Sequence, residues 1–239
     1  MSYSHLEPPN EQARLLIIRK YHVPTAFQEP IFQELTTLAA HIFGLPVAFL
    51  SLVDGAQVDF PATHGVPDLR VLPREAALCS MAVHQHATVV LNDISQGSDS
   101  PHWQTAQRFR MEFYAGAPLL IEQHYAVGVM CLSDNQSRAF TSQEEAVLNE
   151  LAAIASQAIT TRWQYVTEAA GAPRWPAVQQ LAIEDINLLR ALIRRLRAQF
   201  ADAALHVVQR RLVNLRETVA GLSALLPSAS IPVRPPLGA

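Results

Sequence analysis

The 239-residue chain has few cysteines and glycines and no excess of charge of one sign. Two cysteines, Cys79 and Cys131, are too few for a disulfide framework. The 18 Lys and Arg against 21 Asp and Glu give a formal net charge of −3, which offers no electrostatic argument for binding nucleic acid or an anionic membrane. The nine glycines form no glycine-rich phosphate loop, and no nucleophile elbow or paired-carboxylate motif occurs.

Long apolar runs are also missing. No run approaches the ~20 residues that span a bilayer, and residues 1–11 have neither the basic nor the hydrophobic region of a signal peptide. We therefore expect a soluble, cytoplasmic protein without a membrane or nucleic-acid partner. A composition of 49% hydrophobic and 16% charged residues supports a buried core and excludes global disorder.

An antiparallel strand pair, residues 113–120 and 128–134, is the feature around which the rest is organised. In the first strand Gly116 leaves space over one sheet face, where a backbone or a ligand can approach. Pro118 cannot donate to a ladder, so this strand should reach an edge or a bulge there. Two interpretations stay open: a cramped strand packed under a helix, or the wall of a pocket.

Three short motifs in this region resemble the GAF domain family, sensory modules related to PAS domains. They are Tyr-Ala-Gly-Ala-Pro-Leu from Tyr114, Gly-x-x-Cys-Leu-x-Asp from Gly128, and Arg-x-Phe-Thr-x-x-Glu from Arg138 to Glu144. The likeness extends from roughly residue 11 to 165. The resemblance implies an α/β (α+β) fold, with a central antiparallel sheet of five to six strands flanked by helices.

The rest of the chain fits this order of elements. Apolar periodicity predicts helices near 11–21, 29–43, 73–86 and 102–110, and strands at 47–53, 58–63 and 88–93. Asp54-Gly55 is a hairpin turn signal. Thr141 and Glu144 form a capping box that begins a helix reaching about Tyr165.

The composition predicts five segments. Residues 1–10 are a disordered tail, 11–168 the GAF-like domain, 169–180 a linker, 181–226 a helical segment and 227–239 a proline-rich disordered tail. The helical segment carries an apolar stripe, and the preceding domain leaves no core to cover it, so we expect a long helix in a homodimeric coiled coil, or a helical hairpin. The stripe that would form this dimer helix is Leu189, Ile193, Leu196, Phe200, Val208, Leu212, Leu215 and Val219.

GAF domains typically bind a small molecule between a sheet face and the segments that cover it. Carried onto this chain, the resemblance implies a ligand pocket, although a generic core would supply the same apolar residues. Its candidate residues are Phe49, Ser51, Phe60, Cys79, His84, Asp93, Phe109, Tyr114, Gly116 and Cys131. The ligand and any cofactor stay unknown. The Asn-Lys…Phe-x-x-x-Asp-Glu signature of cyclic-nucleotide-binding members is missing. Bilin-binding members usually have a His directly after the Cys, whereas here Ser80 follows Cys79.

Three other functions deserve weighing. Some GAF proteins reduce free methionine sulfoxide, but here one cysteine falls in a predicted helix and the other in mid-strand, where Cys usually serves as a small hydrophobe. His84 and His86 lack a metal motif, and His206 lacks the acidic residue that follows a phosphotransfer histidine. We therefore expect no catalytic and no metal-binding residue. The interpretation is a regulatory protein that binds a small ligand or an unknown signalling partner, with a ligand-free interaction scaffold as the alternative.

Overall fold

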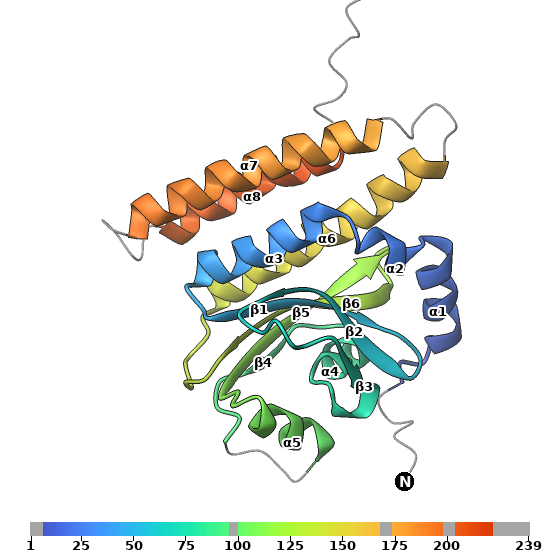
Figure 1. The fold of residues 1–239 in the computed structure, drawn as a ribbon, viewed down its shortest axis with the longest axis vertical. Coiled ribbons are helices and arrows are strands. Elements are labelled where there is room, and N and C mark those ends of the chain that lie inside the picture. The colour runs from blue at the N-terminus through green and yellow to red at the C-terminus, as the bar shows by residue number, and fades with distance from the viewer. Residues whose placement is uncertain (1–6, 96–99, 168–173, 198–203, 222–239) are drawn as a thin grey trace, which may run out of the picture.

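A six-stranded antiparallel sheet lies at the centre of the computed structural model, which describes residues 7–95, 100–167, 174–197 and 204–221 (Figure 1). The strand order is β3-β2-β1-β6-β5-β4. This confirms the predicted central antiparallel sheet of five to six strands. The strands are β1 (Val47–Val53), β2 (Gln57–His64), β3 (Val71–Pro73), β4 (Val89–Leu91), β5 (Phe113–Ile121) and β6 (Tyr125–Asp134).

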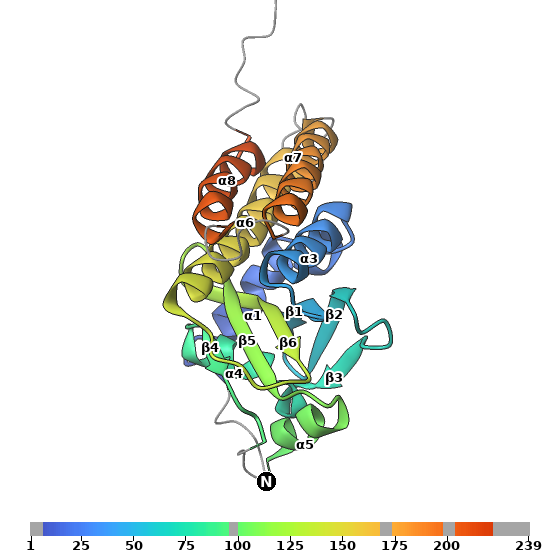
Figure 2. The ribbon, with the colours of Figure 1, turned by 90° about the vertical axis from the view of Figure 1, so that its left-hand side faces the viewer.

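Helices cover both faces of this sheet (Figures 1 and 2). One face carries α3 (Pro30–Phe43) and α6 (Ser142–Thr167), with α7 (Arg174–Arg197) and α8 (Ala204–Val219) as an outer layer. The other face carries the 3-10 helix η2 (Arg74–Ala76), α4 (Cys79–Gln85) and α5 (Pro101–Arg108). Two shorter helices, α1 (Glu11–Lys20) and α2 (Val23–Ala26), lie beside the sheet; α2 and β3 had no counterpart in the sequence prediction.

The alternation of side chains along β5 divides the interior into two cores, because successive side chains of a strand point to opposite faces. Phe113, Ala115 and Leu119 pack under α3 and α6, whereas Tyr114 packs on the side of α4. The open edge predicted at Pro118 is also present. β4 pairs only with residues 114–116 of β5, so Pro118 lies beyond it.

The predicted capping box begins α6 as expected. The Thr141 amide donates to Glu144 Oε2 at 2.8 Å, and the Glu144 amide donates to Thr141 Oγ1 at 3.2 Å. Arg138 forms an ion pair with the same Glu144 carboxylate. The capping residues therefore connect the start of α6 to the turn that follows β6.

The α1 helix is attached through a buried charge cluster that the sequence did not reveal. Arg14 is fully buried and its Nη1 donates to the carbonyl oxygens of Val53 at 2.6 Å and Ala126 at 3.2 Å. Glu11 lies between two arginines, with Arg14 Nη2 at 2.8 Å and Arg74 Nη1 at 2.6 Å. Partial burial would raise the pKa of Glu11, but hydrogen bonds and charge from Arg14 and Arg74 outweigh it and lower this pKa to about 2.

The C-terminal segment forms a helical hairpin, and its stripe is covered within the chain. α7 packs on α3, while α8 packs on α6 and α7. The expectation that no core was left for this stripe is wrong, because its residues join one hydrophobic cluster with residues of α3 and α6. α7 also begins at Arg174, inside the linker expected at 169–180. Buried stripe residues are Leu189, Ile193, Val208, Leu212, Leu215 and Val219, Leu196 is half-buried, and Phe200 lies outside the described residues.

This burial removes the reason for which these residues were assigned to a dimer helix. Within the described ranges, no helix is both long and apolar enough to cross a membrane.

Candidate functional site

Five of the ten predicted pocket residues meet between the sheet and the η2–α4–α5 side. Phe49, Phe60, Cys79, Phe109 and Tyr114 line a cavity of about 20 Å³. That volume holds roughly one water molecule, whereas small-molecule sites typically measure about 300–1,000 Å³. In this structure the protein's own aromatic side chains fill the space that the resemblance assigned to a ligand.

Gly116 explains how the largest of these side chains fits. A Cβ at Gly116 would lie 2.2 Å from the Tyr114 hydroxyl and 3.0 Å from Val129 Cγ1. The space over Gly116 is thus occupied by the Tyr114 ring, from the same sheet face two residues earlier. At Gly116 the strand is therefore packed and leaves no space for a ligand.

The two cysteines lie together behind the cavity, although their sequence positions gave no sign of it. Cys79 Sγ and Cys131 Sγ are 3.6 Å apart, and the Tyr114 hydroxyl is 3.4 Å from Cys131 Sγ. Burial raises the pKa of Cys131 and of Tyr114 well above their ordinary values. Burial also acts on Cys79, but hydrogen bonds from Cys131, Ser51 and Tyr114 outweigh it and lower its pKa, so Cys79 is the more acidic thiol.

The remaining predicted pocket residues lie outside the cavity lining. Ser51 donates to the Val129 carbonyl at 3.4 Å and sits beside the thiols. His84 is on α4, and its buried Nδ1 has no hydrogen-bond partner among the residues that the structure describes. Asp93 is exposed and accepts hydrogen bonds from Ser95, so the loop after β4 turns it away from the interior.

Sequence reasoning missed several residues that complete the cavity wall. They are apolar and come from the segments around β3, η2 and α5, where short elements leave little periodicity to detect. The missed lining residues are Leu69, Leu72, Ala77, Leu78 and Met111.

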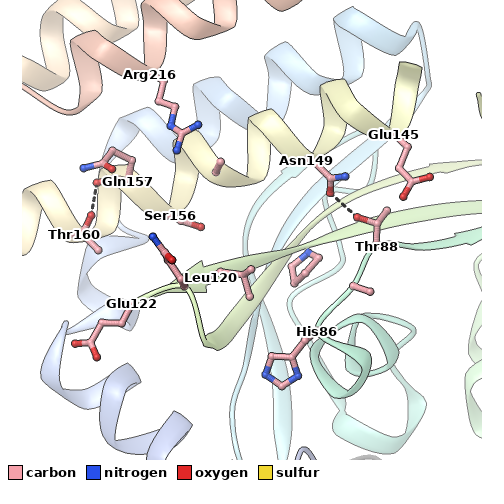
Figure 3. Close-up of a pocket in the computed structure, with 14 residues that line it drawn as sticks. His86, Thr88, Leu120, Glu122, Glu145, Asn149, Ser156, Gln157, Thr160 and Arg216 are labelled. Carbon is pink, nitrogen blue, oxygen red and sulfur yellow. Dashed lines mark hydrogen bonds between the residues drawn. The ribbon is translucent and has the colours of Figure 1, made fainter. Parts of the chain in front are cut away.

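A much larger hollow lies at the open edge of β5, and none of the predicted pocket residues lines it (Figure 3). This edge groove measures about 760 Å³. Its floor is α6, and β5, the turn between α4 and β4, and α8 supply its other sides. Its lining residues are His86, Ala87, Thr88, Pro118, Leu120, Glu122, Gln123, Glu145, Asn149, Ala153, Ser156, Gln157, Thr160 and Arg216.

The edge groove is polar and its charged groups are mixed. Thr88 Oγ1 donates to Asn149 Oδ1 at 2.5 Å, which connects the β4 side to α6. Arg216 reaches down from α8 (Figure 3), and its Nη1 lies 3.4 Å from Glu150 Oε1. Glu122, at the far end, pairs with Lys20 at 2.7 Å. A ligand in this groove would touch the sheet edge, α6 and α8 at once.

The histidines that the sequence singled out do not converge. Among the described residues, no three His, Cys, Asp or Glu side chains gather as a metal site. His206 is exposed on α8, where its Nδ1 lies 3.2 Å from Gln143 Nε2.

Several known proteins are similar to this chain. A cyclic di-GMP phosphodiesterase of Pseudomonas aeruginosa is 26% identical over 146 residues, which is 60% of this chain and 24% of that protein. The chain thus spans about a quarter of the length of this curated relative. The PixJ GAF domain of Thermosynechococcus elongatus, in its blue-light-absorbing form, is 15% identical with a TM-score of 0.49, over 58% of this chain and 88% of that one.

Two further solved structures are similar. The GAF domain region of a putative membrane protein from Geobacter sulfurreducens is 17% identical, covers 60% of this chain and 97% of that one, and has a TM-score of 0.49. The free methionine-R-sulfoxide reductase of Neisseria meningitidis is 18% identical, with a TM-score of 0.47. The match covers 58% of this chain and 82% of that one. The family model for the GAF domain matches residues 28–159. Since that match takes in more than half of the sequence, the chain belongs to the GAF domain family.

Proposed function

We propose that this protein is a non-catalytic regulatory module that acts as a homodimer and passes a signal through the packing of its helical layer. The observation that carries the proposal is the shared core. Residues of the sheet, of α3 and α6, and of the α7–α8 hairpin form one continuous hydrophobic cluster. A change in the GAF sheet or in α6 therefore alters the surface on which the hairpin packs.

A small polar ligand is the proposed input, and the edge groove has the room for it that the interior cavity lacks. With groove residues on β5, α6 and α8, ligand binding would favour one spacing of the hairpin relative to the sheet. Arg216 is the hairpin's contribution to this groove. The output is a change in how the hairpin is presented to a signalling partner.

The coupling can be tested by cutting one hairpin side chain out of the shared core. Leu212 on α8 is fully buried, whereas its neighbour Val213 is 49% exposed. Leu212→Ala should cost about 2–5 kcal/mol and should speed hydrogen exchange of amides in α3 and α6 as well as in the hairpin. Val213→Ala is the matched control and should leave exchange unchanged.

Hydrogen exchange measured by mass spectrometry separates the two outcomes. Faster exchange confined to α7 and α8 in Leu212→Ala would contradict the coupling, because it would show that the hairpin opens without affecting the GAF helices.

A ligand-free interaction scaffold is the second candidate, and the packing of Tyr114 against Gly116 favours it. Native mass spectrometry of protein purified from its own host, without refolding, distinguishes the two. A reproducible extra mass that is released on denaturation supports the ligand, and Ala153→Trp, which would fill the edge groove, should abolish it. A clean polypeptide mass favours the scaffold.

A thiol-dependent reductase has less support from the geometry. Cys79 is 2% exposed and the adjoining cavity holds about one water, so a sulfoxide substrate has no room beside the thiol.

A further inference from the structure

The outer face of α7 carries an exposed apolar seam in addition to its buried one. Leu188 is 70% exposed and Leu181 is 46% exposed. They belong to a heptad series with alternating steps of three and four, the spacing of a coiled-coil contact line. Every member is exposed: Arg174, Ala177, Leu181, Glu184, Leu188, Ala191 and Arg195.

This outer seam is separate from the face that α7 turns towards α3 and α8. That inner face holds Val178, Ala182, Ile186, Leu189 and Ile193, all buried. α7 therefore carries exposed leucines on a second face, between charged residues, and within the described residues only the inner face is covered. Figures 1 and 2 show α7 in the outermost layer of the molecule, where the outer seam is accessible to another protein.

We propose that a second copy of this chain covers the outer seam, with the two α7 helices packed antiparallel about a two-fold axis. The inference gives a surface to the homodimer of the proposed function and replaces the buried stripe, which is not accessible to a second copy. A two-fold contact requires one surface that is complementary to itself. The charges of the seam meet that requirement.

Glu184 lies in the first half of α7 and Arg195 near its end. Both residues are exposed, and neither forms an ion pair with another described residue. Glu184 accepts a hydrogen bond from Gln180. In an antiparallel pair, Glu184 of each copy faces Arg195 of the other. In a parallel pair, each residue would face its own like charge. The charge pattern therefore selects the antiparallel arrangement.

The same alignment also suits the apolar positions. It brings Leu188 of one copy level with Ala191 of the other, so a large side chain faces a small one. Beside Ala191, Leu192 lines a groove of about 290 Å³ between α7 and α8, together with Leu188 and Leu215. Leu188 of each copy can thus enter the groove of the other.

The first test is the mass of the full-length chain in solution, measured by light scattering and sedimentation velocity. The unaltered protein should be a dimer and Leu188→Asp a monomer across the concentrations where the unaltered protein dimerises. Leu16→Asp is the matched control, because Leu16 is 62% exposed on α1, away from the seam, and this variant should stay dimeric. A monomeric unaltered protein, or a dimeric Leu188→Asp, would overturn the proposal.

A charge exchange tests the antiparallel direction. Glu184→Arg and Arg195→Glu each place like charges opposite one another and should weaken dimerisation about tenfold. The double variant restores both pairs and should dimerise as the unaltered protein does. Singles with unchanged dissociation constants, as a parallel pair predicts, or a double variant that does not recover, would contradict this geometry. Circular dichroism confirms that each variant is folded.

The failure of this surface is distinguishable from failure of the proposed function. A monomer in which Leu212→Ala still speeds exchange in α3 and α6 would remove the homodimer and leave the coupled regulatory module.

Discussion

The partly buried carboxylate of Glu11 makes the stability of this protein sensitive to acid in a defined pH range. The pKa of Glu11 falls from its ordinary 4.5 to about 2 because Arg14 and Arg74 hold the charged form. A carboxyl group whose pKa is lower in the folded than in the unfolded state gives its full stabilisation at pH values above its unfolded pKa. Stability is therefore lost as the pH falls from 4.5 towards 2.

The magnitude follows from the two pKa values. At 1.36 kcal/mol per pKa unit, the difference corresponds to at most about 3 kcal/mol. The Glu11 carboxyl keeps some contact with water, so screening reduces this to about 1–2 kcal/mol. Above pH 6 Glu11→Gln should lower the free energy of unfolding by that amount, and by pH 3 more than half of the difference should have disappeared.

Urea unfolding at pH 6 and pH 3, followed by tryptophan fluorescence, measures this difference directly. Glu122→Gln is the control, since Glu122 pairs with Lys20 on the surface and its removal should change stability little at either pH. A Glu11→Gln variant whose deficit is the same at both pH values would refute the reasoning. So would one as stable as the unaltered protein at pH 6.

Two further predictions concern the packed interior. Gly116→Ala would place a methyl group 2.2 Å from the Tyr114 hydroxyl, so chemical denaturation should show a free energy of unfolding lower by about 1–3 kcal/mol. In the control Gly55→Ala, the new methyl group meets no atom closer than 3.7 Å, and this variant should unfold at nearly the same denaturant concentration as the unaltered protein. Because Cys79 and Cys131 are both buried, a chromogenic aromatic disulfide should react with two thiols in denaturant but only very slowly with the native protein. Rapid reaction of the native protein would show that this core opens readily.

Local pattern in the sequence was enough for most of the elements, although not for the short α2 and β3, and for the faces of the strands. The alternation of Phe113, Tyr114 and Ala115 has only one partition into two faces, because the period of a strand is two. The capping box of Thr141 and Glu144 involves residues three apart, so it could be identified without knowing the rest of the fold.

Contacts between distant segments could not be derived in the same way. Periodicity showed that the stripe through Leu212 and Leu215 had to be covered but not by what, since a second chain and a helix of the same chain offer the same apolar surface. No local pattern marks Arg14 as a core residue, yet it is buried because carbonyls from β1 and β6 and the Glu11 carboxylate surround it.

The sequence by itself therefore determined the family, the sheet and the order of its elements, because these depend on spacings of two to four residues and on motifs of contiguous residues. Only the tertiary structure decided that Tyr114 fills the interior, that Cys79 and Cys131 touch, and that a hollow of about 760 Å³ lies at the edge of β5. Those outcomes depend on the shapes of side chains from segments that meet only after folding, and no pattern within one segment encodes the volume left between them.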